Sequence, residues 1–319
     1  MHGLCKLFTM LFCIWLTSNC QAEPSAWYFT ANDVNTLHNK PADHRLPYGD
    51  DAFQFGDLRL PNGQGPYPVA IIIHGGCWLS KFATLQNTAA LADALRDIGI
   101  ATWNIEYRSI DNNGGGWPGT FTDVAHAADF LHHLANKYSL DLKRVIVIGH
   151  SAGGQLALWL AGRHRLPPYS ELYIKNPLEL RGVITLGGVT DLLAFRQQAI
   201  KVCGTDVVDR LLGSVPAQIP INYKQGSPNA LLPFDVPQVL IYGADDSVVP
   251  IEFGHTYAQE ALKKGDVVKL AEVPYAGHHE YNVPNSVTWP TLRSAALLLL
   301  GQLTSPQEHA EHTHLANPS

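Results

Sequence analysis

The chain has 319 residues, of which 46% are hydrophobic and 16% charged, a composition typical of a soluble globular protein with one large α/β domain or two smaller ones. Its formal net charge is −6, from 22 Lys and Arg against 28 Asp and Glu, and the basic residues form no cluster. Nucleic acids and anionic membrane surfaces are bound through basic patches, so we expect neither as a partner.

The first 22 residues predict a secretory signal. Lys6 gives the segment a positive charge near its N-terminus, and "LFTMLFCIWL" is an apolar core too short to span a bilayer. The segment ends in the small residue Ala22. We therefore expect cleavage after Ala22, export to the periplasm or the medium, and no stable membrane span afterwards. The alternative is a lipoprotein signal with Cys20 lipidated, which we disfavour because Asn19 stands where such a signal has a small residue.

Short apolar runs alternate with longer amphipathic stretches along the rest of the chain. This alternation predicts parallel strands joined by right-handed crossover helices, and hence a doubly wound, mostly parallel sheet of the α/β class. An antiparallel edge strand is expected first, over 53–60. The predicted core strands cover 69–75, 100–107, 144–150, 182–188, 238–244 and 267–273, and the predicted helices cover 84–98, 121–138, 151–163, 252–264 and 289–303.

Two segments interrupt the alternation. Residues 111–120 form a turn-rich loop, and residues 189–235 mix a short helical piece with proline and polar residues, which predicts a cap over the domain. No repeat or linker divides the chain, so we expect one domain over 23–303.

The end of the chain, 304–319, is polar and contains three histidines. We interpret it as a flexible tail, with metal binding by these histidines as the weaker alternative. They are His309, His312 and His314.

A serine stands where the strand-like pattern at 144–150 changes to the helical pattern at 151–163. Gly149-His150-Ser151-Ala152-Gly153 is a G-x-S-x-G sequence, in which small residues permit a sharp turn that presents a serine hydroxyl above the sheet. The alternative is that Ser151 only caps the following helix. The strand before it and the helix after it favour a nucleophile.

A serine hydroxyl needs a general base, and the base needs a carboxylate to hold its tautomer. "YGADDSVVP" places Asp245 and Asp246 after one predicted strand, and "VPYAGHHEYNVP" places His278 and His279 after the last. The chain order is therefore serine, aspartate, histidine, each just beyond a strand.

On these residues the sequence resembles the α/β-hydrolase superfamily, over essentially the whole mature chain. The resemblance implies a Ser151–His278–Asp246 triad, because the acid commonly stands in G-x-x-D-x-x-V-P and the base commonly follows a glycine. Asp245 and His279 are then neighbours of the triad. Asp191, which follows the preceding strand, is the fallback acid.

"IIIHGGCW" ends the first parallel strand and resembles the HGG oxyanion loops of esterases and lipases. The resemblance implies that the backbone amides of Gly76 or Cys77, together with Ala152, bind the oxyanion. Such a site needs no metal and no cofactor.

The H-G-G-x-W form resembles the carbohydrate-esterase-like and kynurenine formamidase-like branch of the superfamily. We expect a serine esterase that cleaves small-molecule carboxylic esters through an acyl-enzyme. The alternatives are an arylformamidase acting on N-formylkynurenine and a non-enzymatic binding protein of this fold. Candidate residues of the substrate pocket are Trp78, His150, Trp117, Tyr275 and His279.

Two cysteines, Cys77 and Cys203, remain once residues 1–22 are removed. Neither has a CxxC or metal-ligand spacing. We interpret both as small buried hydrophobic side chains rather than as a bridge or a reactive thiol.

Overall fold

Eight strands form one sheet in the order β1-β2-β4-β3-β5-β6-β7-β8. The computed structural model describes residues 28–303, so the predicted signal at 1–22 and the tail at 304–319 lie outside the described residues. β1 and β2 are antiparallel to their neighbours, and all other pairs are parallel. The strands are β1 (His44–Pro47), β2 (Phe55–Arg59), β3 (Tyr67–Ile73), β4 (Ala101–Ile105), β5 (Leu140–His150), β6 (Gly182–Leu186), β7 (Gln238–Gly243) and β8 (Val268–Val273).

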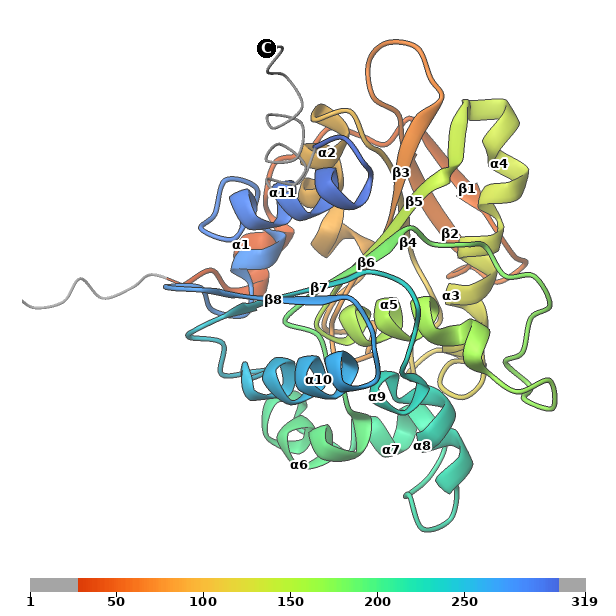
Figure 1. Ribbon diagram of the computed structural model, residues 1–319, viewed down its shortest axis with the longest axis vertical. Helices are drawn as coiled ribbons and strands as arrows, with labels where there is room; N and C mark the ends of the chain where they lie inside the picture. Colours follow the sequence, from red (N-terminus) through yellow and green to blue (C-terminus); the bar gives the residue numbers. More distant parts are fainter. Residues whose placement is uncertain (1–27, 304–319) are drawn as a thin grey trace, which may run out of the picture.

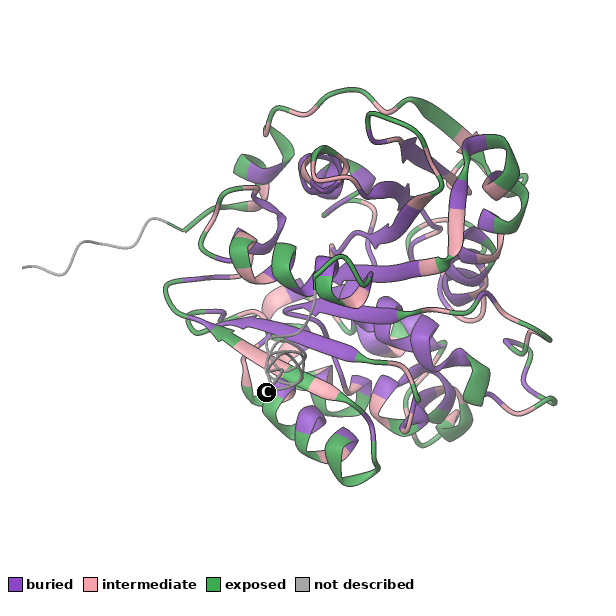
Figure 2. Ribbon diagram, turned by 45° about the horizontal axis from the view of Figure 1, so that its top comes forward, coloured by how far each residue is buried: buried purple, intermediate pink, exposed green. Residues whose placement is uncertain are grey.

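Helices cover both faces of the sheet (Figure 1). One face packs against α2 (Ala89–Asp97) and α11 (Trp289–Leu299), and the other against α3 (Gly119–Asp129), α5 (Ala152–Gly162) and α10 (Glu252–Lys263). Successive strand residues point to opposite faces, so Ile71 belongs to the second core and Ile72 to the first. Two-sided burial explains why these strands read as unbroken apolar runs, and Figure 2 shows the central strands buried along most of their length.

The prediction of a doubly wound, mostly parallel sheet is confirmed, with three local differences. The helix expected over 121–138 is divided at Phe130 into α3 and α4 (Leu131–Tyr138). At this point the His133 amide donates to the Phe130 carbonyl, three residues back, and this tighter turn separates the two helices. The short elements α1 (Ala31–Asn35) and β1 were not predicted, and β1, not the strand expected over 53–60, forms the antiparallel edge of the sheet.

The segment between β6 and β7 folds into four helices that form a cap beside α5 and α10 (Figure 1). They are α6 (Leu192–Cys203), α7 (Val207–Leu212), α8 (Pro220–Gly226) and α9 (Pro228–Leu231). The Asp191 side chain caps α6 by accepting from the Ala194 amide, and Gly204 ends that helix in the left-handed conformation. The cap therefore lies within the predicted insertion at 189–235, with more helix than its sequence indicated.

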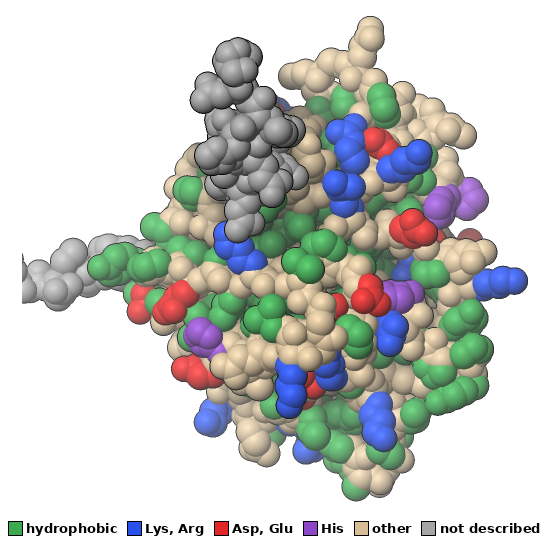
Figure 3. Space-filling view, viewed as in Figure 1, with side chains coloured by type: hydrophobic (Ala, Val, Ile, Leu, Met, Phe, Trp, Pro, Cys, Tyr) green, Lys and Arg blue, Asp and Glu red, His purple; other side chains and the backbone are tan. Residues whose placement is uncertain are grey.

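The surface of the described residues carries mixed charge. On the face drawn in Figure 3, Lys and Arg side chains lie among Asp, Glu and hydrophobic side chains. Within residues 28–303, no helix combines the length and the apolar character needed to cross a membrane.

Candidate active site

Ser151 lies in a strained turn between β5 and α5. Its φ is 55° and its ψ is −119°, and its side chain makes no capping hydrogen bond to α5, so the helix-cap interpretation of this serine has no support. A Cβ at Gly149 would lie 2.0 Å from the Gly153 carbonyl oxygen, and a Cβ at Gly153 would lie 2.2 Å from the Ile73 carbonyl oxygen. The two glycines of the motif are therefore required for the chain to pass so closely, and a non-glycine residue holds the strained position between them.

His278 is bonded to a buried carboxylate. Its Nδ1 lies 2.8 Å from Oδ2 of Asp246, whose side chain is fully buried. A carboxylate can only accept, so Nδ1 carries the proton and, in the neutral ring, Nε2 keeps a free lone pair. The other oxygen of Asp246 accepts from the amides of Val248 and Val249 at 2.9 Å, which fixes the carboxylate in place.

Neither the neighbouring Asp245 nor the fallback acid Asp191 contacts His278. Asp245 is exposed. Asp191 uses one oxygen to cap α6 and the other to accept from the Asn229 amide at 2.9 Å. The geometry therefore joins Asp246, and neither alternative, to His278.

Tyr281 contacts the triad carboxylate, a role that the sequence analysis did not predict. Its hydroxyl lies 3.1 Å from the same Asp246 oxygen that His278 contacts, and it accepts from the Gly243 amide at 2.6 Å. Tyr281 therefore supports the carboxylate from the histidine loop itself. Its position three residues after His278 was the available signal.

His150 holds the backbone of the histidine loop. Its Nε2 lies 2.8 Å from the His278 carbonyl oxygen, and its Nδ1 lies 3.0 Å from Nδ2 of Asn282. The carbonyl can only accept, so Nε2 donates and Nδ1 accepts, which is the neutral ring. Burial first, and then the neighbouring His278 and His279, hold the pKa of His150 well below its usual value, consistent with this neutral form.

Ser151 and His278 line the same cavity of about 180 Å3. Among the residues predicted for the substrate pocket, His150 and His279 line this cavity, whereas Trp117 and Tyr275 do not. Trp117 instead packs against Phe121, and its indole donates to Glu171. Tyr275 is 74% exposed. The remaining lining residues are Ala31, Gly76, Cys77, Phe82, Ala83, Asn87, Val202 and Val248.

Ser151 also lines a second, smaller cavity of about 10 Å3. Trp78, the fifth predicted pocket residue, lines this one. Its indole is fully buried and donates to Oε1 of Gln155 at 3.0 Å. The other lining residues are Cys77, Ala152, Val189, Phe195, Cys203 and Val248.

The residues predicted for the oxyanion hole surround Ser151. Gly76 and Cys77 line the larger cavity, and Cys77 and Ala152 line the smaller. Among residues 28–303, none of these three backbone amides donates to a protein acceptor. Because these residues line the two cavities together with Ser151, their amides are available to bind a negative charge that develops there.

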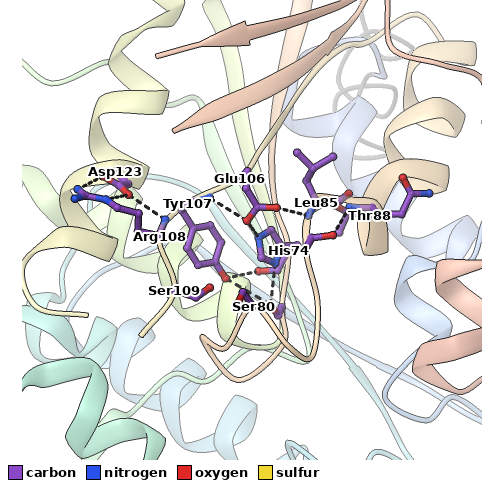
Figure 4. A network of polar contacts seen from close by, with 12 residues as sticks. His74, Ser80, Leu85, Thr88, Glu106, Tyr107, Arg108, Ser109 and Asp123 are labelled. Carbon is purple, nitrogen blue, oxygen red and sulfur yellow. Dashed lines mark hydrogen bonds and ion pairs between the residues drawn. The ribbon is translucent and has the colours of Figure 1, made fainter. Parts of the chain in front are cut away.

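A buried network fixes the start of the oxyanion loop (Figure 4). Nε2 of His74 lies 2.8 Å from Oε1 of Glu106, and the Tyr107 hydroxyl donates to the His74 carbonyl at 3.0 Å. Burial alone would raise the pKa of the Glu106 carboxyl, but His74 and the amides of Leu85 and Tyr107 outweigh it and hold that pKa below its usual value. The charged carboxylate thus anchors the loop.

Cys77 and Cys203 form a disulfide, which corrects the interpretation of both as separate buried hydrophobic residues. Their separation of 126 residues gave no local signal. The cap brings the end of α6 to the oxyanion loop, and only this placement makes the pairing possible.

The described residues contain no group of three or more His, Cys, Asp or Glu arranged to hold a metal ion. The groups that meet at Ser151 are those of acyl transfer: a strained serine, an imidazole with a free Nε2, and open amides.

The sequence profile of the BD-FAE family matches residues 57–260, more than half of the chain. The chain belongs to the BD-FAE family. This span includes Gly76, Ser151 and Asp246, and it ends before His278.

Individual relatives agree with the family. The chain is 28% identical over 265 residues to Esterase LipC of Mycobacterium tuberculosis, covering 80% of this chain and 64% of LipC. It is also 28% identical over 120 residues to the isoprenylcysteine alpha-carbonyl methylesterase ICME of Arabidopsis thaliana, covering 37% of this chain and 27% of ICME. The chain therefore spans less than two thirds of the length of either relative.

Solved structures agree with the fold. A truncated carbohydrate esterase from gut microbiota has a TM-score of 0.68 at 21% identity, covering 82% of this chain and 99% of that one. An acetyl ester-xyloside bifunctional hydrolase from Caldicellulosiruptor lactoaceticus has a TM-score of 0.64 at 20% identity, and the match covers 83% of this chain and 98% of that one. The α/β-hydrolase fold predicted from the sequence is confirmed.

The second histidine of the loop makes stability depend on pH. Burial first, and then the neighbouring His278, lower the pKa of His279 to about 4, against the opposing charges of Asp246 and Asp33. An unfolded histidine titrates near 6.5, so between pH 6.5 and 4 the unfolded chain binds more protons than the folded one. The contribution is fully present above pH 6.5 and is lost as the pH falls toward 4.

We therefore expect His279→Gln, which cannot titrate, to lose less stability on acidification than the wild type. The difference at pH 4.5 should be about 2 kcal/mol in the free energy of unfolding, measured by urea denaturation at pH 7 and pH 4.5. An equal loss in both proteins would show that His279 is not held neutral by the fold.

Proposed function

We propose that this protein is a carboxylic ester hydrolase that works through an acyl-enzyme on Ser151. The observation that carries the proposal is the shared cavity of Ser151 and His278, with Nδ1 of that histidine bonded to the buried Asp246. The family and the esterase relatives support the same chemistry.

In the first half-reaction, the Ser151 hydroxyl oxygen attacks the acyl carbon while Nε2 of His278 takes its proton. The carbonyl oxygen becomes an oxyanion, which the amides of Cys77 or Gly76 and of Ala152 bind. Asp246 stabilises the protonated ring without taking its proton. His278 then returns the proton to the leaving alcohol oxygen, and the acyl group remains on Ser151.

In the second half-reaction, water replaces the alcohol. His278 takes a proton from the water as its oxygen attacks the acyl carbon, and the same amides bind the second oxyanion. The bond to Ser151 breaks, and the serine oxygen recovers its proton from His278. The products are a carboxylic acid and the free enzyme.

The two cavities accept the two ends of the ester. His278 must reach the leaving oxygen, so the alcohol end belongs in the 180 Å3 cavity that this histidine lines. The acyl end then enters the 10 Å3 cavity lined by Trp78, Val189 and Phe195. A cavity of that size holds about one water-sized group, so we assign the enzyme to esters of short acyl chains.

The alcohol cavity offers a substrate one open polar contact among largely apolar lining residues. Asn87, His150 and His279 line it, and Nδ1 of His279 is buried without a partner among the described residues. A hydroxyl group of the substrate would satisfy this nitrogen. The carbohydrate esterase and the acetyl ester-xyloside hydrolase that share the fold support a short-chain ester of a sugar or polyol as the substrate class.

We expect a strong preference for short acyl groups. The ratio kcat/KM for 4-nitrophenyl acetate should exceed that for 4-nitrophenyl hexanoate by about 10-fold or more, since the longer chain cannot enter the small cavity without displacing its lining. Equal values for the two esters would contradict the assignment of the acyl end.

The activity is tested by initial rates of purified residues 23–319 on 4-nitrophenyl esters, acetylated xylan, methyl ferulate and N-formylkynurenine. The proposal expects ester hydrolysis that disappears in the Ser151→Ala protein. Faster cleavage of N-formylkynurenine would assign the protein to amide hydrolysis instead, and no Ser151-dependent turnover would favour a binding protein.

We also propose export, with cleavage after Ala22. Disulfides persist in oxidising compartments, so the Cys77–Cys203 bridge supports a location outside the cytoplasm. N-terminal sequencing of the protein from the periplasm or medium tests this. A mature chain that begins at Cys20 would instead assign a lipoprotein.

A further inference from the structure

The Cys77–Cys203 disulfide lies at the active site and joins two separate parts of it. Cys77 belongs to the oxyanion loop after β3, and Cys203 is the last residue of the cap helix α6. Both cysteines line the small cavity beside Ser151, and Cys77 also lines the larger one. The bridge therefore touches both spaces that the two ends of the ester would occupy.

The oxyanion loop needs such an anchor because its backbone is strained. Cys77 and Trp78 both have a φ of 55°, and a non-glycine residue in this region costs about 1–2 kcal/mol. Such conformations persist only where the surroundings hold them.

Trp78 is held by hydrogen bonds. Its indole donates to Gln155, which in turn donates to the Gly226 carbonyl at 2.9 Å, and its carbonyl accepts from the Ile110 amide at 2.9 Å. Among residues 28–303, Cys77 has no backbone hydrogen bond outside regular secondary structure. Its covalent bond to Cys203 is therefore a direct restraint on Cys77, whose amide is a candidate oxyanion donor.

The bridge also forms part of the wall of the small cavity assigned to the acyl end of the ester. The small cavity has room for about one water-sized group, and two of its lining residues are the bridged cysteines. The same cavity is lined by Phe195, which belongs to α6 like Cys203, and by Val189, which precedes that helix. Because α6 carries part of this wall, releasing its end from the loop would let the wall move away from Ser151.

We propose that the Cys77–Cys203 disulfide is a positioning element of the active site, which holds the oxyanion amides in place and limits the length of the acyl group. This inference rests on the proposed ester hydrolysis. It makes Cys203, in the cap, a positioning residue for chemistry at Ser151. Loss of the bridge should change both the rate and the acyl selectivity.

The test compares the wild type with Cys203→Ala in steady-state hydrolysis of 4-nitrophenyl acetate and hexanoate, below the Tm of both proteins. We expect kcat for the acetate to fall about 10-fold or more, as for a misplaced oxyanion donor, with KM changed by less than about twofold. The ratio of kcat/KM for hexanoate to that for acetate should rise about 10-fold. Ile200→Ala, on the exposed side of α6, is the matched control and should behave as the wild type.

A second arm uses the wild-type chain in case the variant does not fold. Dithiothreitol transfers two electrons and two protons to the bridge, which leaves two cysteine thiols and oxidised dithiothreitol. With two free thiols confirmed by titration, the folded reduced protein should show the same fall in kcat and the same shift in selectivity, and both should reverse on reoxidation.

A purely structural bridge predicts a different result. It would lower Tm on removal but leave kcat and the acyl selectivity unchanged at temperatures where the protein is folded, and that outcome would overturn the inference. Absence of Ser151-dependent ester hydrolysis in the oxidised wild type would instead overturn the proposed function, and the inference with it.

Discussion

Ser151→Ala should lower kcat for 4-nitrophenyl acetate by about 10⁶-fold, the size of the loss when the nucleophile of a serine hydrolase is removed. The physical reason is that Ser151 supplies the hydroxyl in the turn between β5 and α5, where it lines the same cavity as His278. The oxyanion amides and the cavity remain, so a small residual rate over water is expected. Stopped assays with high enzyme concentration measure this residual.

The fold should not change in that variant. The side chain makes no capping hydrogen bond to α5, so its removal costs little structure. Within the described residues, the Ser151 hydroxyl forms no hydrogen bond to the sheet, so none is lost with the oxygen. Ser247→Ala, at an exposed serine of the acid loop, is the control and should retain full activity. Retention of more than about a hundredth of the rate by Ser151→Ala would remove this serine from the mechanism.

Asp246→Asn should lower kcat by about 10⁴-fold. The backbone amides of Val248 and Val249 both donate to one oxygen of the side chain, so the substituted amide would keep its oxygen there and turn its NH2 group toward His278. Nδ1 of His278 would then have to accept, which moves the proton to Nε2 and removes the base. The loss thus comes from the wrong tautomer in an intact site.

The neighbouring carboxylate supplies the control for that variant. Asp245→Asn removes the same charge one residue away, at an exposed position, and should change kcat by less than about twofold. Thermal melts should show both variants folded at the assay temperature. A similar loss of activity in the two variants would mean that local charge, and not the His278 contact, sets the rate.

The local motifs of the chain predicted that Ser151, Asp246 and His278 would lie together, and the structure places them at one cavity or in direct contact. G-x-S-x-G fixes the turn because only glycine fits at 149 and 153, and this requirement can be recognised without the fold. The acid and the base follow strands whose ends meet at one edge of a parallel sheet, so chain order alone brought Ser151, Asp246 and His278 together.

The surroundings of the site could not be predicted in the same way. Trp117 and Tyr275 follow strands as well, yet one packs onto Phe121 and the other faces solvent, because the direction of a loop side chain depends on local backbone angles and packing. Tyr275 has a φ of 58°, which the sequence does not indicate. Proximity to a strand end is thus a weaker guide for aromatic loop residues than for a triad.

The disulfide shows a further limit of sequence interpretation. Cys77 lies in a recognisable motif, but Cys203 lies in an insertion whose helices follow no repeat of the fold. Their pairing depends on how the cap helices pack against the rest of the domain, which is a tertiary property. The same is true of Phe195, which comes from α6 into the small cavity.

Transfer of the acyl group through Ser151 is tested most directly by trapping the acyl-enzyme. The protein is mixed with 4-nitrophenyl acetate, quenched in acid during turnover, digested and examined by mass spectrometry, with Ser151→Ala treated in parallel. One added acetyl group is expected on the peptide that contains Ser151, and none on the corresponding peptide of the variant. Turnover of the ester with an acetyl group on another residue, or with the same label in the variant, would contradict acyl transfer through Ser151.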